Sequence, residues 1–123
     1  MSATSDITIK TQQGYVEVKL TGEYSLEREK EFATQIANYC RQEHISKVLV
    51  DMAGQREIVP IVDRMELGDF FSEIWPSHTR LALLVSREQI LPDNLHFQAA
   101  ASKRGVQVKV CLSIDEAKSF LEV

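Results

Sequence analysis

Val48-Leu49-Val50 and Leu81-Ala82-Leu83-Leu84-Val85 are the two stretches that decide the predicted fold. Each is a short apolar run, typical of a strand that is buried on both faces of a sheet. Between them, Pro60 is suited to the first position of a helix that runs to about Ile74, where Pro76 prevents its extension. Because strand–helix–strand alternation favours parallel pairing through right-handed crossovers, the two strands are predicted to be parallel.

Two strands and a helix are predicted before this centre. Ile7–Lys10 and Tyr15–Leu20 alternate apolar and polar residues, and Gly14 between them suits a hairpin turn with positive φ. Ser25 is a suitable N-cap for a helix over roughly Leu26–Glu43. One stripe of that helix is expected to be buried: Phe32, Ile36, Tyr39 and Cys40.

The C-terminal part repeats the alternation. A helix is expected from Asp93 or Asn94 to Arg104, with Gly105 as its left-handed terminator, followed by a strand over 106–110. Ser113 and Glu116 have capping-box spacing and predict a last helix. Its expected buried stripe is Ile114, Ala117, Phe120 and Leu121.

The predicted order is therefore ββαβαβαβα, an α/β fold. We expect a single five-stranded, mostly parallel sheet with an antiparallel N-terminal edge strand, and one sheet face not fully covered by helices. Residues 1–5 are predicted to be flexible and residues 6–123 to form a single domain.

Composition narrows the functional classes. The chain has 123 residues, with 14 basic and 18 acidic side chains, and this acidic balance argues against nucleic acid as a partner. No apolar run approaches the roughly 20 residues of a membrane helix, and Met1–Asp6 lacks the core of a signal peptide. Two cysteines are too few for a disulfide scaffold, so a soluble, cytoplasmic protein is expected.

Several motifs carry a resemblance to a known superfamily. They are Val48-Leu49-Val50-Asp51, Asp63-Arg64-Met65-Glu66-Leu67-Gly68, Arg80–Val85, Lys103-Arg104-Gly105-Val106 and Asp115–Leu121. From about Ile7 to Leu121 the chain resembles the SpoIIAA-like branch of the STAS (anti-sigma-factor-antagonist) superfamily. The resemblance implies a single (β/α) superhelix with sequential strands, a bacterial regulatory role, and kinship with CRAL-TRIO lipid-binding domains.

The resemblance also implies a regulatory phosphorylation site, but this chain lacks the Ser or Thr that would carry the phosphate. The best-known members carry a phosphorylatable Ser or Thr at the start of the second helix, and its phosphorylation switches binding to a kinase-like anti-sigma partner. From Lys47 through Phe71 this sequence has no Ser and no Thr. A phosphate at that helix N-terminus therefore has no hydroxyl to carry it, and a phospho-switched role is not expected.

Two arginines are candidates for binding an anion. Arg56 lies in the loop after the third predicted strand, and Arg87 follows the fourth, so both are expected at the carboxyl edge of the sheet. Arginines beside helix N-termini suit a carboxylate or phosphate. The alternative is two solvated side chains paired with Glu57 and Glu88.

The second helix holds the remaining candidate residues. Asp63 and Arg64 fall within its apolar arc, where they either orient a ligand or partner or form a structural pair. Ile61, Met65 and Gly68 on an adjoining side add an apolar excess that suggests a pocket wall or an oligomer contact, as the alternative to plain core packing of the arc. The candidate binding residues of the arc are Leu67, Phe70, Phe71 and Trp75.

Nothing in the sequence predicts catalysis, a metal or a cofactor. His44, His78 and His96 lack metal-ligand spacing, and Cys40 and Cys111 are expected to be buried, reduced thiols. There is no glycine-rich phosphate loop and no nucleophile motif.

Two functions remain. The first is a non-enzymatic STAS-like binding or regulatory module that acts through protein–protein contacts at the second helix and the preceding loop. The alternative is a small carrier of an apolar or acyl-anion ligand in a CRAL-TRIO-like pocket, with the anionic group near Arg56 and Arg87. A homodimer, through the less covered sheet face or the second helix, is compatible with either function.

Overall fold

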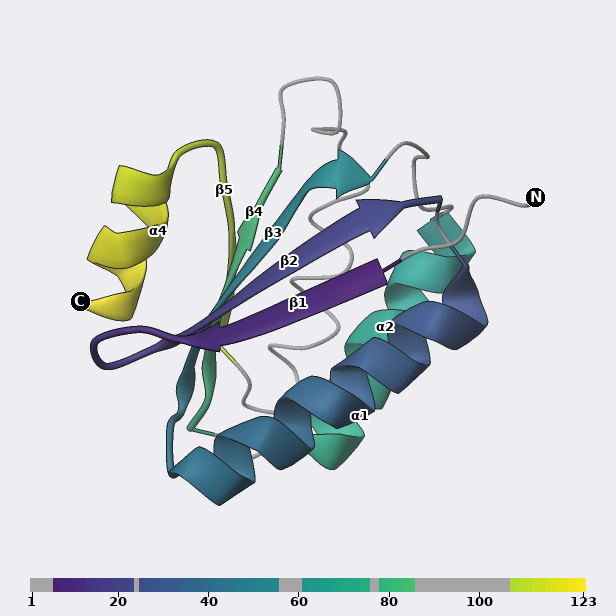
Figure 1. Cartoon of the computed structure of the whole chain (residues 1–123). Coiled ribbons are helices and arrows are strands. Elements are labelled where there is room, and N and C mark those ends of the chain that lie inside the picture. The colour runs from purple at the N-terminus through teal and green to yellow at the C-terminus, as the bar shows by residue number, and fades with distance from the viewer. Residues whose placement is uncertain (1–5, 24, 56–60, 76–77, 86–106) are drawn as a thin grey trace.

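A single five-stranded sheet organises the molecule (Figure 1). The computed structural model describes residues 6–23, 25–55, 61–75, 78–85 and 107–123. The strands lie side by side in chain order, with β1 antiparallel to β2 and the other pairs parallel. The expected mixed sheet with an antiparallel edge strand is thus confirmed. The strands are β1 (Asp6–Thr11), β2 (Val16–Gly22), β3 (Lys47–Gln55), β4 (Arg80–Leu84) and β5 (Gln107–Cys111).

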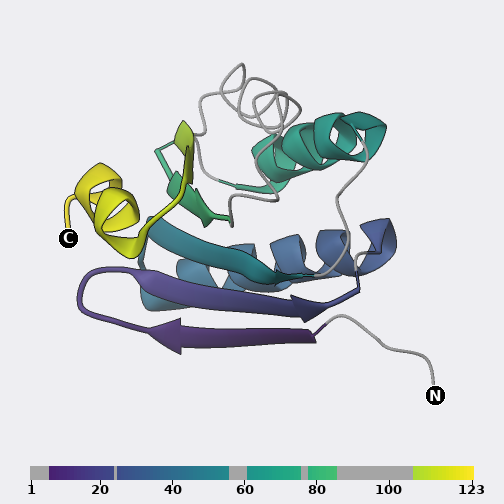
Figure 2. The same ribbon diagram turned by 90° about the horizontal axis from the view of Figure 1, so that it is seen from above.

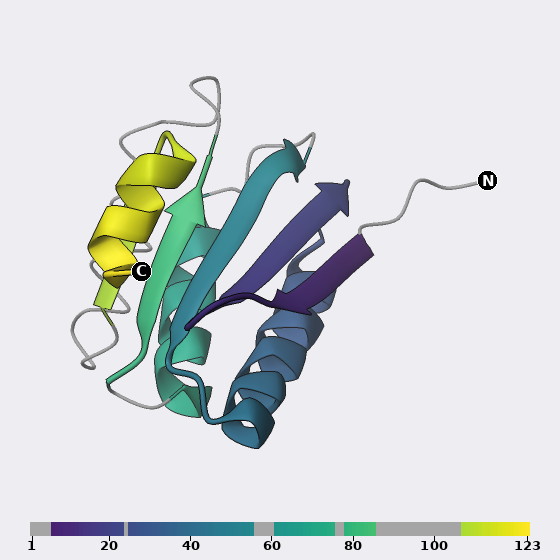
Figure 3. The same ribbon diagram turned by 60° about the vertical axis from the view of Figure 1, so that its left-hand side comes forward.

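Helices lie on both faces of the sheet (Figures 1 and 3). The helices α1 (Leu26–Glu43) and α2 (Ile61–Ile74) lie next to each other on one face. The short helix α4 (Ile114–Leu121) lies on the opposite face and contacts β3, β4 and β5 (Figure 2). The helix expected between Asp93 or Asn94 and Arg104 lies outside the described residues.

Alternation along the strands separates the core into two parts. On the face of α1 and α2, the larger part contains Val16 and Val18 of β2, Val48 and Val50 of β3, and the α1 residue Phe32. The smaller part lies under α4 and takes the alternate strand residues. Its members are Tyr15, Leu49, Ala82, Leu84, Cys111, Ala117 and Leu121. On this face α4 covers β3, β4 and β5, and none of the described helices covers β1 and β2 (Figure 3).

Capping residues begin α1 and α4 where the sequence predicts, whereas Pro60, the predicted start of α2, lies outside the described residues. The Arg28 N–H donates to Ser25 Oγ at 3.5 Å at the start of α1, and the Glu116 N–H donates to Ser113 Oγ at 3.1 Å in α4. Gly14 in the hairpin has φ +83°, as expected. None of the helices among the described residues has the length and apolar character that crossing a membrane requires.

One expectation for α4 is wrong. Ile114 was expected in the buried stripe but is 50% exposed. It is the first residue of α4, three positions after the end of β5 and three before the buried Ala117, so it lies at the outer end of the packed stripe. Ala117 and Leu121 are buried as expected, and Phe120 is half-buried.

Candidate functional site

The inner side of α2 is anchored firmly in the core. Leu67 is 5% exposed and Trp75, directly after the helix, is 4% exposed. The Trp75 indole N–H donates to the Ala33 carbonyl of α1 at 3.1 Å. The Arg41 guanidinium of α1 donates to the Ile74 carbonyl, the last of α2. These contacts hold α2 in one position against α1.

The outer side of α2 carries exposed apolar and acidic side chains. Val62 is 70% exposed and Met65 is 50% exposed, both within the first five residues of the helix. With 3.6 residues per turn, three exposed acidic residues share their side. We call this set the α2 outer stripe: Val62, Met65, Glu66, Asp69 and Glu73.

One edge of the outer stripe is tied to α1 by a charged contact. The Nζ atom of Lys30 lies 2.5 Å from a Glu66 carboxylate oxygen and 5.6 Å from the centroid of the Phe70 ring. Phe70 is half-buried and packs against the main core. The boundary between α1 and α2 is therefore an ordered, charged surface with an aromatic ring beneath it.

Some of the α2 residues that the sequence predicts as binding residues lie in or against the core, and the side chains of the others are not described by the structure. Leu67 and Trp75 belong to the main core, Phe70 packs against it, and Asp63 is half-buried. Arg64 and Phe71 lie in α2, but their side chains are outside the described part of the structure.

The expected anion site at the carboxyl edge is not among the described residues. Arg56 and Arg87 both lie outside them. Exposed apolar residues follow the strands at this edge, and of these the sequence pointed only to Met65, as part of the apolar excess beside the helix arc. These exposed residues are Val62 and Met65 after β3, and Leu112 (42% exposed) and Ile114 after β5.

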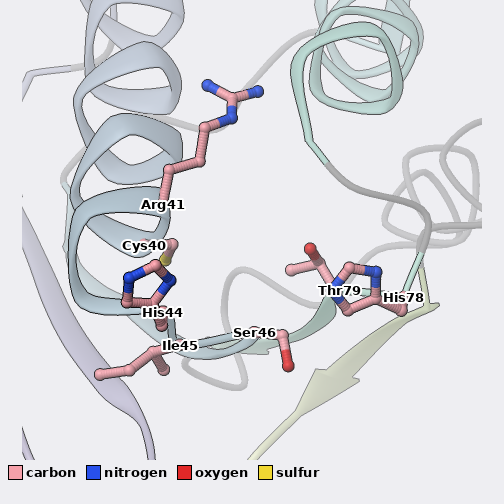
Figure 4. Close-up of a pocket in the computed structure, with 7 residues that line it drawn as sticks. All are labelled: Cys40, Arg41, His44, Ile45, Ser46, His78 and Thr79. Carbon is pink, nitrogen blue, oxygen red and sulfur yellow. The ribbon is translucent and has the colours of Figure 1, made fainter.

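A pocket lies at the other edge of the sheet, where β3 and β4 begin (Figure 4). It has a volume of about 350 Å³. The end of α1 forms one side, and the residues that lead into β3 and β4 complete it. The lining residues are Cys40, Arg41, His44, Ile45, Ser46, His78 and Thr79. The sequence signal for this site is weak, because its two halves lie more than 30 positions apart.

The two thiols are unsuited to nucleophilic chemistry. Cys40 and Cys111 are both buried and free, as expected. Burial raises the pKa of the Cys40 thiol to about 11, against a smaller opposing effect of Arg41. Burial also raises the pKa of Cys111 to about 11, and the nearby Glu116 carboxylate adds to the increase. Both groups are protonated at neutral pH, whereas the thiolate is the reactive form.

No metal centre is present in the portion of the chain that the structure describes. None of its His, Cys, Asp and Glu residues form a group of three that could hold a metal ion. His44 and His78 are exposed, as expected, and His96 lies outside the described residues.

Two solved structures share the fold. An anti-sigma factor antagonist from Mycobacterium paratuberculosis superposes with a TM-score of 0.69 at 12% sequence identity, over 100% of both chains. An uncharacterized DUF3478-family protein with a SpoIIAA-like fold, from Shewanella loihica PV-4, has a TM-score of 0.58 at 16% identity, over 97% of this chain and 94% of the other. No protein-family model matches the sequence, and no curated protein matches it.

The chain therefore has a SpoIIAA-like fold, as the sequence resemblance implies. At these identities the likeness establishes the fold, and function has to be argued from the residues. The expected kinship with CRAL-TRIO domains stays a prediction.

Proposed function

We propose that this chain is a non-enzymatic binding and regulatory module that acts through protein–protein contacts at α2 and the loop before it. The observation that carries the proposal is the exposure of Val62 (70%) and Met65 (50%) on a helix whose inner side is locked in the core. Exposed aliphatic side chains on a rigid helix suit a partner groove, because little conformational entropy is lost on binding.

The chemistry of the outer stripe suggests the kind of partner surface. Two aliphatic side chains near the start of α2 are followed by Glu66, Asp69 and Glu73. A complementary partner has an apolar groove with Lys or Arg side chains at its rim. The similar fold of an anti-sigma factor antagonist supports a protein partner of this general type.

Regulation by phosphorylation at the start of α2 is not part of the proposal. Residues 47–71 contain no Ser and no Thr. Binding through the outer stripe is then controlled by the amount of each partner or by another signal. A preparation treated with a phosphatase is expected to bind as well as an untreated one.

Site-specific photo-cross-linking tests the proposal. A benzoylphenylalanine at Val62 is expected to capture a defined protein in a lysate of the native host, and unlabelled wild-type protein should compete with the capture. The same group at Lys19, an exposed position on the uncovered sheet face, is the control. Capture of the same proteins from both positions would contradict a specific site on α2.

A matched pair of variants separates this surface from general stickiness. Val62→Ser with Met65→Ser is expected to abolish capture, assayed from a second position on the outer stripe, such as Asp69. The control variant, Leu112→Ser with Ile114→Ser, removes similarly exposed apolar groups elsewhere and should leave capture unchanged. Equal loss in both variants would indicate non-specific adhesion.

The alternative of a small carrier predicts a different result. It requires an apolar or acyl-anion ligand that stays bound during purification, with Arg56 and Arg87 near its charged group. Native mass spectrometry of protein purified from its own host would detect such a ligand or a homodimer. A stoichiometric small molecule that is lost in an Arg56→Ala, Arg87→Ala variant would favour the carrier over the protein-binding module.

A further inference from the structure

We propose that the pocket at the beginning of β3 and β4 is a binding site for a small organic anion, distinct from α2 and its outer stripe. Figure 4 shows Cys40, Arg41 and His44 on the α1 side of this pocket, with His78 and Thr79 on the other. The two sides come from segments joined only through β3 and α2, so the folded sheet is needed to form the site.

The charge of the lining favours an anion. The chain as a whole has 18 acidic and 14 basic residues, yet none of the seven described lining residues is a carboxylate. Arg41 carries a permanent positive charge. His44 and His78 each offer at least one ring N–H donor, whether neutral or charged. The lining therefore supplies donors and positive charge without a competing acid.

The helix ends beside the pocket work against an anion and have to be considered. Both α1 and α2 end here, and the partial negative charge of a helix C-terminus repels anions. One carbonyl in the last turn of each helix already has a partner: Cys40 O accepts from the Ile45 N–H at 3.0 Å, and Ile74 O accepts from Arg41. These two bonds weaken the negative potential at the two helix ends without removing it. Arg41 also donates to Asn38 Oδ1 at 3.2 Å, and its guanidinium carries five N–H groups in all.

Thr79 supplies the observation that points to a ligand. Thr79 is only 2% exposed, and in Figure 4 its side chain is directed across the pocket toward α1. Its backbone carbonyl accepts from the Gln107 N–H at 3.1 Å. Within the described residues its hydroxyl has no hydrogen-bond partner. A buried hydroxyl without a partner is destabilising, and an anionic oxygen in the pocket would supply the missing acceptor.

Size and polarity define the ligand class. A volume of about 350 Å³ lies at the small end of the range for ligand sites. Cys40 and Ile45 provide an apolar wall, and the Cys40 thiol, with its pKa raised to about 11 by burial, adds no negative charge at neutral pH. The pocket therefore suits a compact apolar group that carries a carboxylate or a phosphate.

Calorimetric titration of the full chain with benzoate and with phenyl phosphate tests the proposal. The head group that binds more tightly identifies the favoured anion, and benzamidine, a cation of similar shape, is the charge control. We expect at least one anion to bind and benzamidine not to bind. If neither anion binds, or if benzamidine binds equally well, the pocket is not an anion site.

Three variants assign the binding to this pocket. Arg41→Gln is expected to weaken anion binding at least tenfold, and Thr79→Val several-fold without lowering the stability of the fold. Arg28→Gln, at the other end of α1, is the matched control and should bind like the wild type. Unchanged affinity in both Arg41→Gln and Thr79→Val would show that the anion does not bind in this pocket. Cross-linking from Val62 is expected to be unchanged in Thr79→Val, which leaves the printed contacts between α1 and α2 intact, so the two proposals fail independently.

Discussion

The indole nitrogen of Trp75 lies 3.1 Å from the carbonyl oxygen of Ala33, and this hydrogen bond joins the end of α2 to the middle of α1. Trp75 is 4% exposed and Ala33 is fully buried. The bond therefore lies in the core, where a donor without a partner is costly. It fixes the position of α2 and, with it, the direction in which the outer stripe faces.

Replacement of Trp75 measures this anchor. Trp75→Phe removes the indole N–H and part of the buried ring, so we expect the free energy of unfolding to fall by about 2 kcal/mol. Urea unfolding followed by circular dichroism gives the value. Tyr39→Phe, which removes a hydroxyl that bonds Thr11 at the surface, is the control and should cost less than about 0.5 kcal/mol. Equal losses would mean that the indole bond does not contribute specifically.

Gly54 in β3 has no room for a side chain. A Cβ atom there would lie 3.0 Å from Thr21 Cγ2 and 3.2 Å from the Leu20 carbonyl oxygen of β2. Gly54→Ala is expected to destabilise the fold by roughly 1–2 kcal/mol, because the backbone of β2 would have to move. Adding Thr21→Ser removes the Cγ2 contact and should restore part of the loss. No recovery in a double-mutant cycle would assign the whole effect to the carbonyl contact.

The cap at the start of α4 is predicted to contribute measurable stability. Ser113→Ala removes the acceptor for the Glu116 N–H and should cost about 1 kcal/mol. The Glu116 carboxylate also accepts from the Leu112 N–H at 2.9 Å, so Glu116→Ala is expected to have a similar effect. Ser119→Ala, an exposed position inside the same helix, is the control and should be neutral. Thermal unfolding separates the two cap variants from the control, and equal melting temperatures in all three would contradict a contribution from the cap.

The buried thiols predict a loss of stability in alkaline solution. Burial raises the pKa of Cys40 and Cys111 from about 9 to about 11, so both thiols are protonated in either state below pH 8. Between pH 9 and 11 the unfolded chain loses these protons while the folded chain keeps them, and stability falls as pH rises. We expect roughly 1–2 kcal/mol for each thiol.

Urea unfolding at pH 8 and pH 10.5 measures this effect. A Cys40→Ala, Cys111→Ala variant provides the baseline, because the other groups titrate equally in both proteins. The wild type should lose more stability over this interval than the variant does. An identical loss in the two proteins would contradict the alkaline contribution of the thiols.

Local signals in the sequence were sufficient for most of the architecture. The apolar runs at Val48 and Leu81, separated by a predicted helix, predicted parallel inner strands. Ser25 and Ser113 predicted the starts of two helices. These features depend on residues close together in the chain. The true length of β3 was not predicted: it extends to Gln55, because Gly54 and Gln55 pair with Thr21 and Gly22 of β2.

The surfaces were harder to predict than the elements. The exposure of Val62 and Ile114 depends on where each helix begins relative to the sheet. The apolar pattern of a helix does not indicate that position. The pocket between Arg41 and Thr79 depends on how α1 and α2 pack, which the periodicity of either helix does not specify. Arg56 and Arg87 stay predictions, since neither is among the described residues.

The chain-order arrangement of the strands bears on how the protein is made. Each strand is a neighbour of the strand synthesised just before it, so pairing never has to wait for a distant segment. A nascent chain that has left the ribosome as far as β3 already contains three adjacent strands and the helix that covers them. Each later strand then adds to an existing sheet edge, which suits vectorial folding during translation.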